Sequence, residues 1–299
     1  MRPQKLKYML LDVFTNERLK GNPLAVVCNG DGLLDNEMQA IASEFNLSET
    51  VFLCRPKHDR NTAAVRIFTP RTELNFAGHP TVGAAIVLGQ QHKVPVVRIE
   101  ENVGLITALV EKSQHGTALA RFGLPRLPEE AGNPPDRHDI AMALGILPSE
   151  VGCGLYKPAV STAGTLFYLV PVANAKVLRA LKLERRGWEE IFPLGDYSVY
   201  VFTETPEEND NDFAARMFSP GMGIGEDPGT GAAAAALIGL VARHVPFSDG
   251  QEEYVIRQGH EMGRPCRISM QIRKDAGELR YGGIGGEAVI IGEGELDLG

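Results

Sequence analysis

The segment FNLSETVFL, residues 45–53, places one carboxylate, that of Glu49, directly before an apolar run typical of a β-strand. A side chain at the mouth of a strand is held in a fixed direction, which suits a functional group. In a cleft with little water its pKa would rise toward neutrality, which favours a group that takes and returns a proton. We therefore consider Glu49 a candidate acid–base residue. The alternative is a solvated glutamate at the start of a strand.

Two junctions rich in glycine and proline are the second candidate. Gly78 and His79 lie in AGHPTVGAA, and Asp227 and Gly231 lie in EDPGTGAA, each before an apolar run with helical character. A helix N-terminus offers N–H groups and partial positive charge, and glycine lets the backbone approach a ligand closely. These four residues predict an anion-binding cleft beside Glu49. Because Asp227 would repel a lone carboxylate, we expect a small-molecule substrate with both a carboxylate and a donor group. The alternative is two tight turns with a capping aspartate and a packed histidine.

The two junctions belong to an internal repeat. RIFTPRTELNFAGHPTVGAA at residues 66–85 and RMFSPGMGIGEDPGTGAA at residues 216–233 share an arginine, a phenylalanine and a closing Gly-Ala-Ala. Each copy indicates a strand, a loop and an apolar helix, with the helices expected at residues 80–89 and 232–244. The repeat predicts two similar domains. We place them at residues 1–120 and 121–299, and the last strand could return to the first domain.

Other segments complete the expected organisation. Residues 7–14 and 24–28 read as strands around a turn signal, Gly21-Asn22-Pro23. The glycine-punctuated C-terminal segment, from RISMQIRK to GEGELDL, predicts β-hairpins. The proline-rich stretch at 125–137 is the best linker candidate.

Composition and the absence of certain motifs exclude several classes of partner and cofactor. The net charge of -8 argues against nucleic acid or an anionic membrane as a partner, and no apolar run is long enough for a transmembrane helix. Four separated cysteines fit a reducing cytoplasm and predict neither a disulfide framework nor a zinc site. No HExxH motif or P-loop occurs, and the glycine runs lack the strand–turn–helix setting of a dinucleotide fingerprint. We therefore expect no metal and no nucleotide cofactor.

The ordered series of motifs resembles one family. DVF, GNPLAVV, NLSETVFL, ELNFAGHPTVGAA, RMFSPGMGIGEDPGTGAA and QGHEMGRP are similar to segments of the PhzF family of phenazine biosynthesis proteins, from about residue 8 to the C-terminus. The resemblance implies an α+β fold like that of diaminopimelate epimerase. Such a fold has two pseudo-symmetric domains, each a β-barrel-like sheet around a central helix, with the active site between them.

The resemblance also implies an activity. The founding enzyme isomerises trans-2,3-dihydro-3-hydroxyanthranilate without a cofactor, and a glutamate that corresponds to Glu49 carries the proton from one ring carbon to another. The family's substrate-orienting residues correspond to His79 and Asp227, and its members are commonly homodimers. One position departs from the phenazine enzyme, because Ala232 stands where that enzyme has a serine. The lost hydroxyl puts the phenazine substrate in doubt and leaves the fold prediction unchanged.

Three hypotheses follow. The first is a cofactor-independent isomerase in which Glu49 both removes and returns a proton. The second is a PhzF-like protein without catalysis that binds a small molecule or a protein. The third is a thiol-dependent epimerase, which the absence of cysteine from both junctions disfavours. A Glu49 buried beside His79 and Asp227 would favour the first over the second.

Overall fold

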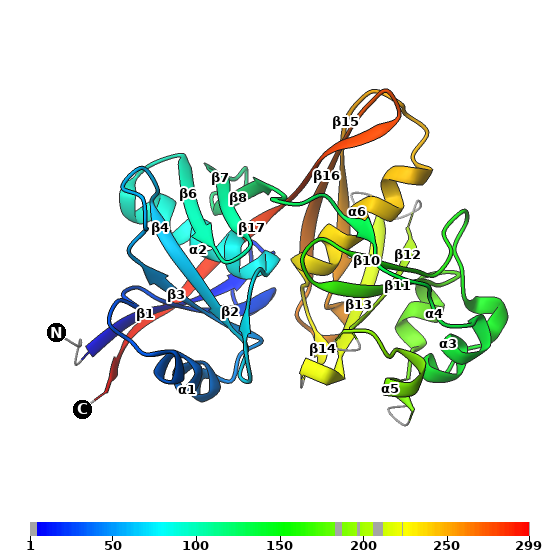
Figure 1. The fold of residues 1–299 in the computed structure, drawn as a ribbon, viewed down its shortest axis with the longest axis horizontal. Helices are drawn as coiled ribbons and strands as arrows, with labels where there is room; N and C mark the ends of the chain where they lie inside the picture. Colours follow the sequence, from blue (N-terminus) through cyan, green and yellow to red (C-terminus); the bar gives the residue numbers. More distant parts are fainter. Residues whose placement is uncertain (1–4, 183–186, 196–197, 206–211, 223, 299) are drawn as a thin grey trace. The chain divides into compact units, whose positions relative to one another are not determined.

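A computed structural model describes the whole chain except residues 1–4, 183–186, 196–197, 206–211, 223 and 299. The chain divides into two compact units (Figure 1). Unit 1 comprises Met1–Pro125 and Ile284–Gly299, and unit 2 comprises Arg126–Gly283. Unit 1 takes up both ends of the chain because the last strand begins in unit 2 and ends in unit 1.

Unit 1 is a closed barrel of strands around one helix. Its elements are β1 (Lys5–Val13), β2 (Asn22–Val27), α1 (Asp35–Phe45), β3 (Glu49–Cys54), β4 (Ala63–Phe68), β5 (Glu73–Leu74), α2 (Gly78–His92), β6 (Val96–Glu101), β7 (Gly104–Lys112), β8 (Ala118–Gly123) and the end of β17 (Glu278–Asp297). The strands pair in the order β17, β1, β2, β3, β4, β6, β7 and β8, and β8 pairs with β17 to close the ring.

Helix α2 fills this barrel, and residues 78–89 are all buried. Its sequence permits this because, apart from His79, it carries small and apolar residues over the first twelve positions. Gly83 lies where α2 packs closely on β2, since a Cβ there would overlap the end of the Leu24 side chain. The helix was expected from Pro80, but it begins at Gly78. Proline is tolerated in this first turn because its missing N–H would have no acceptor within the helix.

Unit 2 likewise packs its strands against one apolar helix, and it has additional helices. Its elements are β9 (Glu129–Glu130), α3 (Arg137–Leu144), η1 (Pro148–Glu150), β10 (Ala159–Thr162), β11 (Leu166–Pro171), α4 (Ala175–Ala180), α5 (Trp188–Ile191), β12 (Val199–Glu204), β13 (Phe213–Ser219), η2 (Pro220–Met222), β14 (Ile224–Asp227), α6 (Gly231–His244), β15 (Gly250–Gln258), η3 (His260–Met262), β16 (Cys266–Asp275) and the start of β17. Helix α6 is the apolar counterpart of α2, and most of its residues are buried.

The strand pairings of the two units follow the same alternation. From β1 to β7 the successive pairs are antiparallel, parallel, antiparallel, parallel and antiparallel. From β10 to β16 the successive pairs have the same polarities in the same order. The predicted α+β class with two similarly built halves is confirmed. In the described part of the chain, every helix is too short or too polar to cross a membrane.

The C-terminal segment corrects one expectation. We predicted β-hairpins with glycine turns. One such turn joins β16 to β17 at Ala276 and Gly277, which both have positive φ, but residues 278–297 then form one continuous strand, β17, where further hairpins were expected. Three of the later glycines, Gly283, Gly285 and Gly294, lie within the strand where other residues approach closely. A Cβ on Gly285, for example, would lie 2.9 Å from the carbonyl oxygen of Ala120 on β8.

Candidate functional site

Glu49 is the first residue of β3, and strand pairing directs its side chain into the barrel. It is the parallel partner of Leu24 on β2. Partners in neighbouring strands share one face of a sheet, and Leu24 faces α2 at Gly83. The Glu49 side chain is only 11% exposed. The expected solvated alternative for Glu49 therefore does not apply.

His79 meets Glu49 from the first turn of α2. It lies four residues before Gly83, so the two share a face of the helix. Its side chain is 3% exposed, and its Nε2 lies 3.5 Å from Oε2 of Glu49. This distance is longer than an ordinary hydrogen bond. Catalytic hydrogen bonds are often long in ligand-free structures.

Burial favours the neutral form of the His79 ring. Its distance from Glu49 would suit an ion pair, but burial lowers the pKa of His79 to about 3, because the imidazolium form would lose its hydration. A neutral imidazole carries one proton, on either Nδ1 or Nε2. The contact with Glu49 is therefore between a carboxyl group and a neutral ring whose tautomer decides its character.

Asn22 is a residue of this site that the sequence reasoning missed. Gly21-Asn22-Pro23 was interpreted as a turn, but Asn22 is the first residue of β2 and is fully buried. Its Nδ2 lies 3.3 Å from Nδ1 of His79. The signal was available in the strand period, because Asn22 precedes the inward-facing Leu24 by two residues.

A second buried carboxyl group packs against the same turn of α2. Thr81 Oγ1 lies 2.7 Å from both the carbonyl oxygen of Ala77 and Oε1 of Glu101. The threonine hydroxyl has one hydrogen, so it can donate to only one of these oxygens. Burial raises the pKa of Glu101 to about 8. In its protonated form Glu101 donates to Thr81, which then donates to Ala77, and both contacts are satisfied.

Unit 2 holds Asp227 by a polar network before helix α6. Thr230 Oγ1 donates to Oδ2 of Asp227 at 2.5 Å, and Nε2 of Gln258 donates to the Asp227 carbonyl oxygen at 2.8 Å. The oxygen of the Gln258 amide accepts from Tyr200 at 3.1 Å and from the backbone of Thr230 at 3.2 Å. Asp227 is 3% exposed. The helix itself begins at Gly231.

The predicted site residues therefore fall into two groups. Glu49, Gly78 and His79 lie together in unit 1, whereas Asp227 and Gly231 lie at the start of α6 in unit 2. All four cysteines are free thiols. Within the described ranges, no three His, Cys, Asp or Glu side chains are grouped to hold a metal ion.

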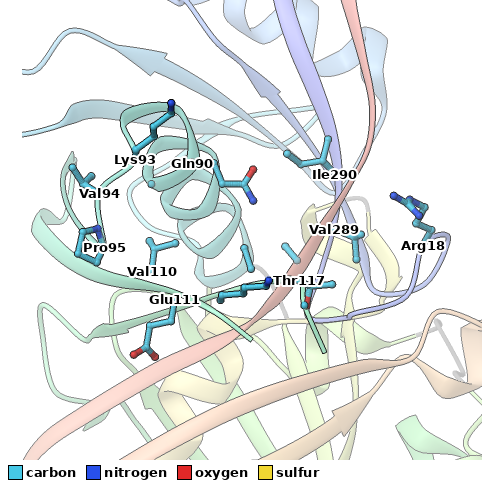
Figure 2. Close-up of a pocket in the computed structure, with 15 residues that line it drawn as sticks. Arg18, Gln90, Lys93, Val94, Pro95, Val110, Glu111, Thr117, Val289 and Ile290 are labelled. Carbon is cyan, nitrogen blue, oxygen red and sulfur yellow. The ribbon is translucent and has the colours of Figure 1, made fainter. Parts of the chain in front are cut away.

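A large surface cavity of unit 1 is separate from this site. Figure 2 shows its lining, which includes Arg18, Lys93 and Ile290 and encloses about 610 Å³. Lys93 follows the last residue of α2, whereas His79 is the second residue of that helix. At 1.5 Å per residue the two positions are about 20 Å apart along the helix. The cavity is lined by none of the five predicted site residues.

Comparison with known proteins identifies related sequences. The family model described as "Phenazine biosynthesis-like protein" (PhzC-PhzF) matches residues 11–294. An uncharacterized isomerase of Mesorhizobium japonicum is 41% identical over 98% of this chain and 99% of its own length. The trans-2,3-dihydro-3-hydroxyanthranilate isomerase of Pseudomonas aeruginosa is 33% identical, again over 98% of this chain and 99% of its own length.

A solved structure supports the fold independently. The crystal structure of a phenazine biosynthesis protein of the PhzF family from Bacillus anthracis superposes with a TM-score of 0.87. The match covers 99% of each chain at 24% sequence identity. At this identity the similarity speaks for the fold alone.

Proposed function

The chain belongs to the phenazine biosynthesis-like PhzC-PhzF family, its curated relatives include isomerases, and from this premise we propose the chemistry of this isomerase. It moves a proton between two carbons of a small carboxylate-bearing substrate. Glu49 serves first as the general base and then as the general acid. The observation that carries the proposal is the buried contact between Glu49 and His79.

A single carboxyl group, that of Glu49, can carry out both proton transfers of the reaction. The Glu49 carboxylate takes a proton from one substrate carbon, and the electron pair of the broken C–H bond enters the conjugated system of the substrate. The Glu49 carboxylic acid then returns the proton to a second carbon, and a new C–H bond forms. No electron leaves the substrate, so the product is an isomer. Burial excludes the water that would compete for the proton.

Substrate binding is assigned to the remaining predicted residues. The backbone N–H groups of Gly78 and Gly231 lie in the first turns of α2 and α6, where the partial positive charge of a helix favours a carboxylate. His79 orients the substrate beside Glu49. Asp227 accepts a hydrogen bond from a substrate amine or hydroxyl. The substrate therefore carries a carboxylate and a donor group.

Three further properties remain proposals. Cofactor independence fits the mechanism above, because a single carboxyl group completes it. A homodimer is expected from the family resemblance. A cytoplasmic location fits the four free cysteines.

A deuterium experiment tests the proposal. The protein is incubated in D₂O with a panel of small cyclic and amino carboxylic acids, among them trans-2,3-dihydro-3-hydroxyanthranilate, the substrate named for the P. aeruginosa relative. We expect one compound to give a new isomer, with hydrogen at the new position from the substrate or deuterium from the solvent. Glu49→Gln should give neither. A panel in which no compound reacts but one binds would favour the non-catalytic alternative.

A further inference from the structure

We propose that Asn22 is a positioning residue that holds the single proton of the neutral His79 ring on Nε2, the nitrogen that faces Glu49. Its side-chain amide does so by donating a hydrogen bond to Nδ1. The assignment of the tautomer stands on the contacts of the two ring nitrogens and on the burial of the ring. Only its catalytic consequence rests on the proposed function.

The fold brings Asn22, His79 and Glu49 together because a two-residue step along strand β2 has nearly the same length as a four-residue step along helix α2. Along β2, Asn22 and Leu24 point to the same face about 6.6 Å apart, and along α2, His79 and Gly83 share a face about 6 Å apart. Leu24 packs on Gly83, so Asn22 reaches His79. Both ends of this arrangement are fixed within one barrel (Figure 1).

The contacts at the two ring nitrogens agree on one tautomer. Nε2 faces Oε2 of Glu49 at 3.5 Å. In the ionised form, in which Glu49 acts as a base, its carboxylate can only accept, so this nitrogen carries the hydrogen. Nδ1 is then an acceptor, and the group before it at 3.3 Å is the NH₂ of Asn22, which is a donor. The opposite tautomer would set a lone pair on Nε2 against the Glu49 carboxylate and a hydrogen on Nδ1 against the amide hydrogens.

The tautomer has a consequence for proton transfer. A ring protonated on Nε2 stabilises the carboxylate form of Glu49 but cannot accept the proton that Glu49 takes from the substrate. To accept it, the ring would have to take the proton on Nδ1, which faces Asn22, and so become an imidazolium, which burial disfavours. The proton therefore stays on Glu49 until it returns to the substrate.

Nitrogen NMR of the full chain with ¹⁵N-labelled histidine tests this directly, because the protonated and unprotonated nitrogens of a neutral imidazole have well separated shifts. In the wild-type protein near pH 7 we expect His79 to be neutral with the hydrogen on Nε2. A hydrogen on Nδ1, or an imidazolium, would overturn the proposal without any variant.

Variants separate the role of Asn22 from that of Glu49. Glu49→Ala removes the carboxylate, and His79 should keep its hydrogen on Nε2 because Asn22 remains. The double variant Asn22→Leu with Glu49→Ala should lose this preference and show both tautomers. If Glu49→Ala alone gives the mixture, Glu49 sets the tautomer and Asn22 does not.

Thr50→Val is the matched control. Thr50 is buried next to Glu49 on β3, and its side chain points to the opposite face of the strand. This variant should leave the His79 spectrum unchanged. The tautomer is read without turnover, so it can be confirmed even if Glu49→Gln remains active, a result that would refute the proposed chemistry alone.

Discussion

Units 1 and 2 share one structural frame. In each, an arginine lies over the ring of the phenylalanine two residues later and binds a glutamate on the next strand through two hydrogen bonds. These residues are Arg66, Phe68 and Glu73 in unit 1, and Arg216, Phe218 and Glu226 in unit 2. The guanidinium carbon is 5.0 Å from the ring centroid in both cases. The repeated sequence thus encodes a repeated contact.

The units differ at the strand that follows the central helix. Strand β6 pairs with β4, and β15 pairs with β13, in the same register relative to Arg66 and Arg216. This register makes Glu101 and Gln258 equivalent, and each contacts a threonine hydroxyl in or next to the first turn of the central helix.

The same position in the two units therefore holds side chains with different acid–base properties. The Gln258 amide is neutral at every pH and has both donors and an acceptor for its network. Glu101 fills the same position with a group that titrates. We conclude that the frame is duplicated while the polar groups near the helix starts have diverged, with the acid–base candidate in unit 1 and the anchored aspartate in unit 2.

The largest effect is expected when the two halves of the predicted site are altered separately. Glu49→Gln keeps the shape of the side chain but cannot take a proton, so kcat should fall by about 10²- to 10⁴-fold while binding persists. Asp227→Asn should mainly raise KM. These constants can be measured with the compound found in the deuterium panel. Equal losses of kcat in both variants would refute the division of roles, and full activity of Glu49→Gln would make Glu49 structural.

The two arginines provide a test of the shared frame. Arg216 is 10% exposed and also donates to the carbonyl oxygens of Leu178 and Leu181, whereas Arg66 is 26% exposed and its second carboxylate partner, Asp35, is on the surface. Arg216→Met should therefore lower the free energy of unfolding by about 3–5 kcal/mol, as expected when a buried charge loses its partner. Arg66→Met should cost less. Urea unfolding of each variant measures this, and a larger loss for Arg66→Met would contradict the ranking.

A further effect should appear in the pH dependence of stability. The pKa of Glu101 is raised by burial from 4.5 to about 8, so between these pH values the folded protein holds a proton that the unfolded chain has released. Its contribution to stability therefore falls as pH rises through this window, by about 1.4 kcal/mol for each unit of pKa shift that is realised.

Glu101→Gln gives unit 1 the residue type of Gln258, its equivalent in unit 2. This variant should no longer lose stability as the pH rises from 4.5 to about 8. The variant should gain stability relative to the wild type at pH 8 and show little difference at pH 4, as thermal unfolding at both pH values would show. Gln258→Glu is the reciprocal variant and should introduce a loss of the same sign. A wild-type protein and a Glu101→Gln variant with parallel profiles would contradict the raised pKa.

Sequence reasoning was accurate where local pattern determines structure. The repeated arginine motif and the apolar runs located both central helices, and the ordered motifs identified the family. It was wrong where one residue serves two purposes: Asn22 looks like part of a turn, and the glycines of β17 look like turns but permit close strand packing.

Long-range contacts explain what the sequence could not provide. The pairing of Glu49 with Leu24, and of Glu101 with Thr81, depends on strand register and helix position across the barrel. A pattern of single residues does not encode that register. The roles of His79, Asp227, Gly78 and Gly231 in binding remain predictions.

The smallest expected effect concerns substrate choice at α6. Ala232 is the second residue of this helix and stands where the phenazine enzyme has a serine. If the start of α6 contacts substrate, Ala232→Ser should raise kcat/KM for trans-2,3-dihydro-3-hydroxyanthranilate by about two- to tenfold, because one hydrogen bond contributes about 0.5–1.5 kcal/mol net. Ala233→Ser, with the hydroxyl on the next and fully buried position, is the control and should give no gain. If kcat/KM of Ala232→Ser for this substrate is no higher than that of the wild type, a hydroxyl at this position does not determine the substrate. A gain in both variants would point to a change in the helix and not to a contact with the substrate.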